Sequence, residues 1–208
     1  ILDGTFPVNS TLPPERELAE KLGVTRPTLR EALQRMSRDG WIEIRHGRST
    51  RVRNYWQEGN LAILGAIAAQ HSHLPADFVA NLLQQRFLLA PAYTRQAVER
   101  APMALLDHLP RLLELTDTPQ AYTSADWELH QQLTILSGNP VFTLILNGFR
   151  DLYLHMGLRY FSLPQARAHS RAFYQSLLQA AQAHDPAAAE ALAQRVMLES
   201  LKFWERSE

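Results

Sequence analysis

Proline and glycine residues divide the first part of the chain into short helices with sharp boundaries. The run Pro13-Pro14-Glu15 opens the first of them, because proline suits the first turn of a helix, where its missing N–H is no loss. Acidic residues at Glu15 and Glu17 suit the positive end of the helix dipole. Gly23 is a good helix terminator, so the pattern predicts a helix over 15–22.

A second helix follows after two residues. Thr25 is a suitable N-cap and Pro27 lies in the expected first turn. The helix should run to about Asp39 and end at Gly40. Apolar residues recur along it at helical spacing and should form its buried stripe: Leu29, Leu33 and Met36.

The period changes from helical to alternating between Trp41 and Val52. Ile42 and Ile44 alternate with charged residues, and His46-Gly47-Arg48 then interrupts the pattern. This indicates a two-stranded hairpin with a glycine at its tip. Helix, tight turn, helix and hairpin is the order of a winged helix-turn-helix.

The rest of the chain predicts only helices. Residues 54–60 form the expected linker, and 61–208 the expected second domain, an antiparallel bundle of about seven helices. One helix should start near Leu61, and the others at prolines: Pro75, Pro102, Pro119, Pro140, Pro164 and Pro186. Pro91 and Pro110 lie inside helical stretches and should kink them. The predicted fold class is therefore mainly α, with a first domain over 1–53. Its start, 1–4, resembles the end of a helix whose beginning is missing.

Charge separates the same two parts. Residues 24–53 carry eight arginines and three acidic residues, whereas residues 57–208 carry 11 basic and 14 acidic residues. A basic module on a mildly acidic body predicts a polyanion partner for the first part only.

Several classes of protein are disfavoured. The chain has no cysteine, which excludes disulfides, thiolate zinc sites and cysteine nucleophiles. No apolar run approaches the roughly 18–20 residues that span a bilayer, and no export leader is present, so we expect a cytoplasmic protein without membrane contact. Serine, histidine and aspartate occur at no spacing typical of a catalytic triad or phosphate loop, so we do not expect an enzyme.

The second predicted helix has the residues that a DNA-reading helix needs. Arg26 and Arg30 are four residues apart and share one face at its start, where such a helix meets base edges. Arginine can pair with guanine through two hydrogen bonds. Thr25 and Thr28 can reach phosphates or a thymine methyl group. Arg16 can contact the backbone or a base, and the hairpin tip can approach the minor groove.

The two segments 12–19 and 23–33 resemble the winged-helix domain of GntR-type bacterial regulators. The resemblance continues over nearly the whole chain to the subgroup that controls fatty-acid metabolism, through 38–41, 54–57, 137–140, 144–148, 159–161 and 173–174, and through Glu199, Ser200 and Trp204. It implies a homodimer on a palindromic operator in double-stranded DNA. It also implies these DNA contacts: Arg16, Thr25, Arg26, Thr28, Arg30, His46, Gly47 and Arg48. Pro27 departs from the pattern, which has threonine there, and loses a hydroxyl contact.

Two effectors are open for the helical domain. Many related regulators sense small carboxylates through a metal held by an aspartate, a histidine four residues later and two further histidines. Asp126 and His130 match the first half, but Tyr174 and Val196 stand where the later histidines would align. Two ligands leave a transition metal under-coordinated, so no metal or cofactor is expected.

The closer resemblance implies a long-chain acyl-CoA inside the bundle. Arg86 would bind the CoA phosphates or adenine, Tyr153 and Tyr160 would line the pocket, and Ser200 and Trp204 would influence the response. His130 would line the pocket or belong to the core. Met197 and Leu201 replace glycines of the subgroup, which puts the chain length and class of the ligand in question. The expected function is a regulator released from its operator by acyl-CoA. The alternatives are a carboxylate-responsive regulator with a metal and an architectural DNA-binding protein without effector.

Overall fold

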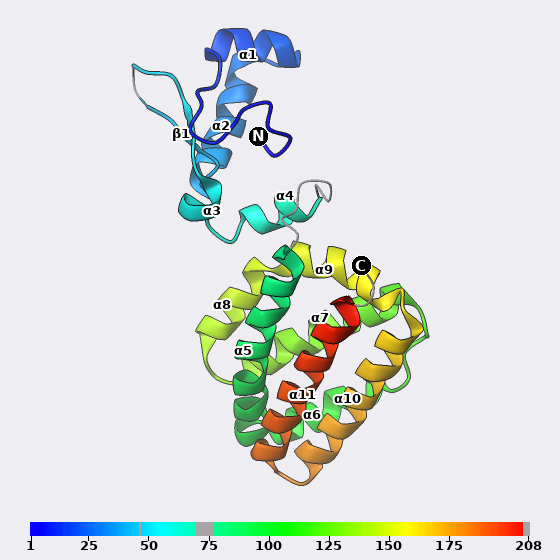
Figure 1. Cartoon of the computed structure of the whole chain (residues 1–208). Helices are drawn as coiled ribbons and strands as arrows, with labels where there is room; N and C mark the ends of the chain where they lie inside the picture. Colours follow the sequence, from blue (N-terminus) through cyan, green and yellow to red (C-terminus); the bar gives the residue numbers. More distant parts are fainter. Residues whose placement is uncertain (46, 70–76, 206–208) are drawn as a thin grey trace. The chain divides into compact units, whose positions relative to one another are not determined.

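The computed structural model describes residues 1–45, 47–69 and 77–205 (Figure 1). It is mainly helical, with eleven helices and one two-stranded sheet in these ranges. Its contacts divide the chain into two compact units, Ile1–Leu74 and Pro75–Glu208. The segment expected as a linker, 54–60, lies inside the first of these units. In the described ranges, no helix has the length and apolarity needed to cross a membrane.

The first two helices have the predicted bounds, α1 at Glu15–Leu22 and α2 at Arg26–Asp39. Gly23 ends α1 in the left-handed conformation, with φ of 66°, and Gly40 ends α2 in the same way. Thr25 caps α2, because its hydroxyl accepts a hydrogen bond from the backbone N–H of Thr28 at 3.4 Å. Leu29 and Leu33 are buried and Met36 is half-buried, which confirms the predicted stripe.

The predicted hairpin is also present. Strands β1 (Ile42–Glu43) and β2 (Arg51–Val52) are antiparallel, and Ile42 pairs with Val52. The N-terminal segment lies along the other edge of β2: Leu12 N–H donates to Thr50 O at 2.8 Å, and Val52 N–H to Ser10 O at 2.8 Å. Residues 1–6 form turns and bends, so the helix end expected at 1–4 is not observed.

The segment expected to be a plain linker contains a short helix, α3 (Tyr55–Glu58), and contacts the end of α2. A Cβ on Gly40 would lie 2.6 Å from Gly59 Cα, so only glycines allow these backbones to approach so closely. Asn60 adds two hydrogen bonds, from its side-chain amide to Arg38 O at 3.0 Å and from its N–H to Asp39 O at 3.3 Å. The end of this segment, at Gly59 and Asn60, is therefore in contact with the end of α2. α4 (Ile63–Ala69) follows.

Seven helices form the second unit in the described residues, and with α4 they make eight in 61–208, where about seven were expected. The seven of the second unit are α5 (Phe78–Arg100), α6 (Pro102–Leu112), α7 (Pro119–Leu136), α8 (Pro140–Gly148), α9 (Arg150–Phe161), α10 (Pro164–Gln182) and α11 (Pro186–Glu205). Five begin at a predicted proline, whereas α9 begins without one. The start expected at Pro75 lies outside the described residues. Pro91 lies inside α5 and Pro110 inside α6.

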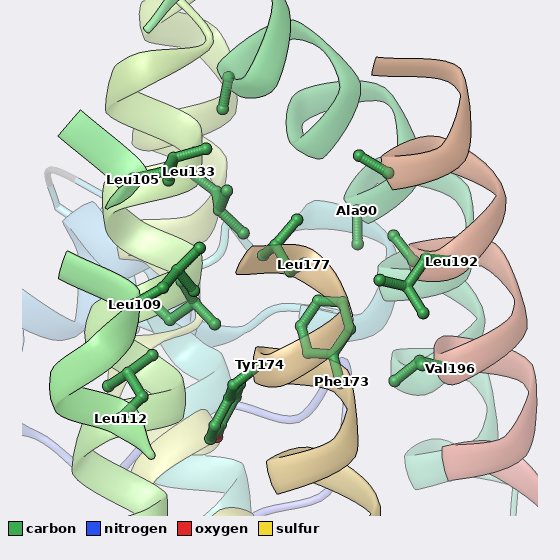
Figure 2. Packing of buried hydrophobic residues seen from close by; sticks show 14 of the residues in the cluster. Ala90, Leu105, Leu109, Leu112, Leu133, Phe173, Tyr174, Leu177, Leu192 and Val196 are labelled. Atoms are coloured by element: carbon green, nitrogen blue, oxygen red, sulfur yellow. The ribbon is translucent and has the colours of Figure 1, made fainter. Parts of the chain in front are cut away.

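The core of this unit is formed by side chains from several helices that point toward one another (Figure 2). Figure 2 labels Leu105, Leu109 and Leu112 of α6, Phe173, Tyr174 and Leu177 of α10, and Leu192 and Val196 of α11. The most extensive pairing is between α5 and α11. These two helices also form part of the cavity described below.

Candidate DNA interface and effector cavity

The residues predicted to contact DNA are exposed at the start of α2 and on the hairpin. Arg26, Thr28 and Arg30 are exposed on α2, as are Arg16 on α1 and Gly47 and Arg48 on the hairpin. The hydroxyls of Thr25 and Thr28 lie 2.8 Å apart. His46, the remaining predicted contact, lies outside the described residues.

Arg30 has a partner that sequence reasoning missed. Its Nη2 donates to Glu15 Oε2 at 2.7 Å, and its Nε lies 3.5 Å from Glu15 Oε1. The hydrogen bond and the charge of Arg30 hold the pKa of the Glu15 carboxyl below its ordinary value. Glu15 was interpreted only as a helix-dipole residue. Its position opposite Arg30 depends on how α1 crosses α2, which spacing along one helix does not give.

A network of ion pairs joins the hairpin to α3. Glu43 accepts from Arg45 at 2.6 Å and from Arg51 at 3.0 Å, and these bonds lower the pKa of Glu43 to about 2. Arg51 also donates to Glu58 of α3 at 3.0 Å. Arg53 Nη1 lies 3.9 Å from the same Glu58 carboxylate, so two arginines connect this part of the chain to α3.

The second unit contains an apolar cavity of about 50 Å³ between α5, α9 and α11. It is lined by Val79, Leu82, Leu83, Arg86, Tyr153, Met156, Gly157, Tyr160, Phe161, Ser200 and Trp204. Five of the six residues predicted to bind the effector are in this lining, and His130 is hydrogen-bonded to Arg86, one of them. The structure therefore brings the predicted set together.

A buried carboxylate lies beside the cavity. Asp126 of α7 is 6% exposed and accepts hydrogen bonds from the hydroxyls of Tyr153 and Tyr174, the latter at 2.9 Å. Arg86 Nη2 lies 3.5 Å from its Oδ2. Burial alone would raise the pKa of Asp126, but His130 when protonated, Arg86 and the hydrogen bonds from the two tyrosines together hold it below its ordinary value.

Arg86 lies in this buried cluster, although it was predicted to bind CoA phosphates or adenine. Its side chain is 22% exposed, its guanidinium carbon lies 4.8 Å from the centre of the Tyr153 ring, and its Nη2 lies 2.9 Å from His130 Nε2. Arg86 Nε is buried and has no hydrogen-bond partner among the described residues.

The far side of the cavity belongs to α11 and the end of α9. Tyr160 Oη donates to Ser200 Oγ at 3.2 Å, and Ser200 Oγ donates to Val196 O at 2.9 Å. The guanidinium carbon of Arg159 lies 4.9 Å from the centre of the Trp204 ring. Met197 and Leu201 line an open groove between α5 and α11 with a volume of about 360 Å³. Leu83 borders both the groove and the cavity.

Asp126 and His130, the two candidate metal ligands, make contacts that do not resemble a metal site. Asp126 and His130 are both buried on α7, and His130 Nε2 lies 3.9 Å from Asp126 Oδ2. The guanidinium of Arg86 bonds to this imidazole. In the described part of the chain, no group of three histidine or acidic side chains is arranged to hold a metal ion.

Comparisons with known proteins agree with this architecture. Residues 1–52 match the model for bacterial regulatory proteins of the gntR family, and residues 53–208 match the FadR C-terminal domain. The fatty acid metabolism regulator protein of Shewanella pealeana is 46% identical over 181 residues, which cover 87% of this chain and 76% of that protein. The protein of the same name from Pasteurella multocida is 44% identical and covers 85% of this chain and 73% of its own length.

Solved structures show the same fold at lower identity. Lar from Listeria monocytogenes aligns with a TM-score of 0.66 at 17% identity, over 99% of this chain and 91% of that one. A GntR protein from Streptococcus agalactiae aligns with a TM-score of 0.51 at 24% identity, over 97% and 94%. The chain therefore belongs to the GntR family of bacterial regulatory proteins and carries a FadR C-terminal domain.

Proposed function

We propose that this chain is a DNA-binding transcription regulator of fatty-acid-metabolism genes, and that long-chain acyl-CoA, bound between α5, α9 and α11, releases it from its operator. Membership in a family of regulatory proteins makes it a transcription regulator rather than an enzyme. Two relatives named fatty acid metabolism regulator support the class of target genes. The observation that carries the effector proposal is the apolar cavity bordered by a buried arginine donor.

The DNA part of the proposal is supported by exposed cations at the start of α2 and on the hairpin. Arg26, Arg30 and Arg48 are exposed, and α2 begins with a capped first turn. A helix of this kind places its first turns against base edges in the major groove. We propose that the protein acts as a homodimer on a palindromic operator in the cytoplasm, because a two-fold dimer matches two half-sites.

The small volume of the cavity would couple ligand binding to movement of the surrounding helices. Ligand pockets usually measure about 300–1,000 Å³, whereas this cavity measures about 50 Å³. A cavity of this volume does not hold a long acyl chain, so we propose that the surrounding helices separate when the ligand enters. The ligand then binds the open form much better than the closed form, which is the differential affinity that an allosteric effect requires.

Burial of the acyl chain can supply enough free energy to weaken DNA binding. Each buried methylene contributes about 0.8 kcal/mol, so a chain of 14–16 carbons contributes roughly 10 kcal/mol before the costs of opening and binding. A hundredfold loss of DNA affinity requires only about 2.7 kcal/mol of coupling.

The test is a fluorescence-anisotropy titration at fixed salt concentration with a duplex selected by the protein from a random library. We expect long-chain acyl-CoA to weaken binding, and CoA or free fatty acid alone to have no effect. Tight DNA binding that acyl-CoA leaves unchanged would contradict the effector proposal and leave the DNA proposal standing.

A variant that fills the cavity sharpens this test. Met156 lines the cavity and is 7% exposed. Met156→Phe should leave the affinity for DNA unchanged and reduce the response to acyl-CoA, because the larger side chain occupies the ligand's space. Met103→Phe is the matched control, since Met103 is 64% exposed on α6. An equal response in both variants would argue against this cavity as the site.

A further inference from the structure

Glu15 and Arg30 form a two-pronged contact on the surface that we assign to DNA. Glu15 Oε2 accepts a hydrogen bond from Arg30 Nη2 at 2.7 Å, and Glu15 Oε1 lies 3.5 Å from Arg30 Nε. The Arg30 side chain is 62% exposed and that of Glu15 33%. One edge of the guanidinium therefore faces the carboxylate, and the group remains accessible to a large partner.

A guanidinium has a second edge with the same geometry. Its five N–H donors lie in one plane, and two parallel donors of one edge match O6 and N7 of guanine. Since Glu15 contacts Nε and Nη2, the edge formed by Nη1 and the second Nη2 hydrogen is left for another acceptor. Nη1 of Arg30 has no hydrogen-bond partner among the residues that the structure describes. Glu15 thus orients the guanidinium of Arg30 and leaves the donors of its second edge free to bind a base.

The carboxylate also affects contacts with the DNA backbone. Glu15 is next to two cations, since the charges of both Arg30 and Arg26 act on it. If Arg30 turned toward a phosphate, Glu15 would lose its partner and face the polyanion with an uncompensated negative charge. Backbone-only binding is therefore penalised, whereas binding to the correct base leaves the ion pair intact.

We propose that Glu15 is a positioning residue that sets the sequence specificity of the DNA interface. It holds Arg30 in the base-reading orientation and disfavours transfer of Arg30 to phosphates. The proposal rests on the assignment of α2 to DNA. It extends that assignment by giving an acidic residue of α1 a role in discrimination, as repulsive elements often have in specific interfaces.

The test compares Glu15→Gln with Glu17→Gln in the full chain. Glu17 is on the same helix and pairs with Lys21 at 3.2 Å, so its substitution changes the net charge equally without touching Arg30. Each protein selects duplexes from a randomised library, and each is then titrated with the wild-type consensus and with a scrambled duplex of equal length over a range of salt concentrations. Circular dichroism verifies that each variant is folded.

We expect Glu15→Gln to lower the ratio of consensus to scrambled affinity by about tenfold, mainly through tighter binding of the scrambled duplex. Base preference should fall at one position of each half-site, and the salt dependence on scrambled DNA should steepen by about one phosphate contact. Glu17→Gln should keep the wild-type ratio and base preference. In an Arg30→Gln background, Glu15→Gln should cause no further loss of base preference.

Two outcomes would overturn the inference. Either the ratio is unchanged in Glu15→Gln, or Glu15→Gln and Glu17→Gln change it equally, which would mean that only net charge matters. If the wild-type protein selects no sequence from the library, the proposed function itself fails, and this result is distinct from the other two.

Discussion

The imidazole of His130 accepts a hydrogen bond from the guanidinium of Arg86, whose Nη2 lies 2.9 Å from His130 Nε2. Because arginine has only donors, Nε2 must be unprotonated and the ring neutral. The remaining proton is then on Nδ1 and points to the hydroxyl of Tyr93, 2.8 Å away. This assignment of tautomer follows from the hydrogen-bond partners alone.

The neutral imidazole makes the stability of the helical unit depend on pH. Burial, with the positive charge of Arg86, lowers the pKa of His130 to about 4, whereas an unfolded histidine has a pKa near 6.5. Between these values the unfolded chain binds more protons, so the free energy of unfolding falls as the pH decreases. From pH 7.5 to 4.5 the loss due to His130 should be about 2–3 kcal/mol.

The measurement is urea unfolding followed by tryptophan fluorescence in a Trp41→Phe, Trp56→Phe background, which leaves Trp127 and Trp204 of the second unit as probes. The matched variant His130→Gln should lose this part of the pH dependence. Burial also lowers the pKa of His108, which acts in the same direction but is present in both proteins. Equal slopes with and without His130 would show that the ring is not held neutral.

Removal of Arg86 should destabilise the same unit. Arg86→Met leaves the buried carboxylate of Asp126 without its cation, and breaking a buried pair in this way costs about 3 kcal/mol or more. Arg86→Met with Asp126→Asn should recover part of this loss, because no unpaired charge then remains. The control is Arg95→Met on the same helix, whose pair with Glu190 is 50% and 38% exposed and should cost less than about 1 kcal/mol. Similar losses in both single variants would contradict the buried pair.

Arg48 should contribute to DNA binding through charge. Arg48 is exposed on the hairpin, so Arg48→Gln should weaken binding to all duplexes similarly and reduce the salt slope of log K by about 0.9. Arg111→Gln, which removes an exposed arginine from α6, should leave the slope unchanged. A slope that does not change in Arg48→Gln would remove the hairpin from the interface.

Alanine substitutions at Gly40 and Gly23 should separate the cost of backbone strain from the cost of a steric clash. Both end a helix with positive φ, of 97° and 66°, so alanine at either position should cost about 1 kcal/mol through backbone strain. Only at Gly40 would the new Cβ also meet another backbone, 2.6 Å from Gly59 Cα. Gly40→Ala should therefore lower the thermal midpoint of the first unit by several degrees more than Gly23→Ala. Equal shifts in the two variants would mean that the close approach of Gly40 to Gly59 does not require a glycine at position 40.

Local signals in the sequence were sufficient to predict the first two helices and the hairpin. Thr25, Gly23 and Gly40 act on their own immediate backbone, so their meaning does not depend on the rest of the fold. The same applies to the prolines that open α6 and α7. The boundary between α8 and α9 has no such signal, since α8 ends at Gly148 and α9 begins at Arg150 with only Phe149 between them.

The sequence predicted a set of residues that the fold brings together at the cavity, but it did not predict the contacts between them. The spacing of Asp126 and His130 placed both on one face of α7, as observed. The bonds from Tyr93, Tyr153 and Tyr174 to these residues come from three other helices, and nothing in the local sequence specifies which helices meet. The pairing of Glu15 with Arg30 was missed for the same reason.

The carboxylate of Asp126 joins four helices at a single point. It belongs to α7 and receives donors from Arg86 on α5, Tyr153 on α9 and Tyr174 on α10. If α5 or α9 moves away from α7, this nearly buried carboxylate loses a donor, so polar bonds as well as packing oppose opening of the small cavity. A molecule that enters the bundle must therefore supply enough binding free energy to break the hydrogen bonds of Asp126.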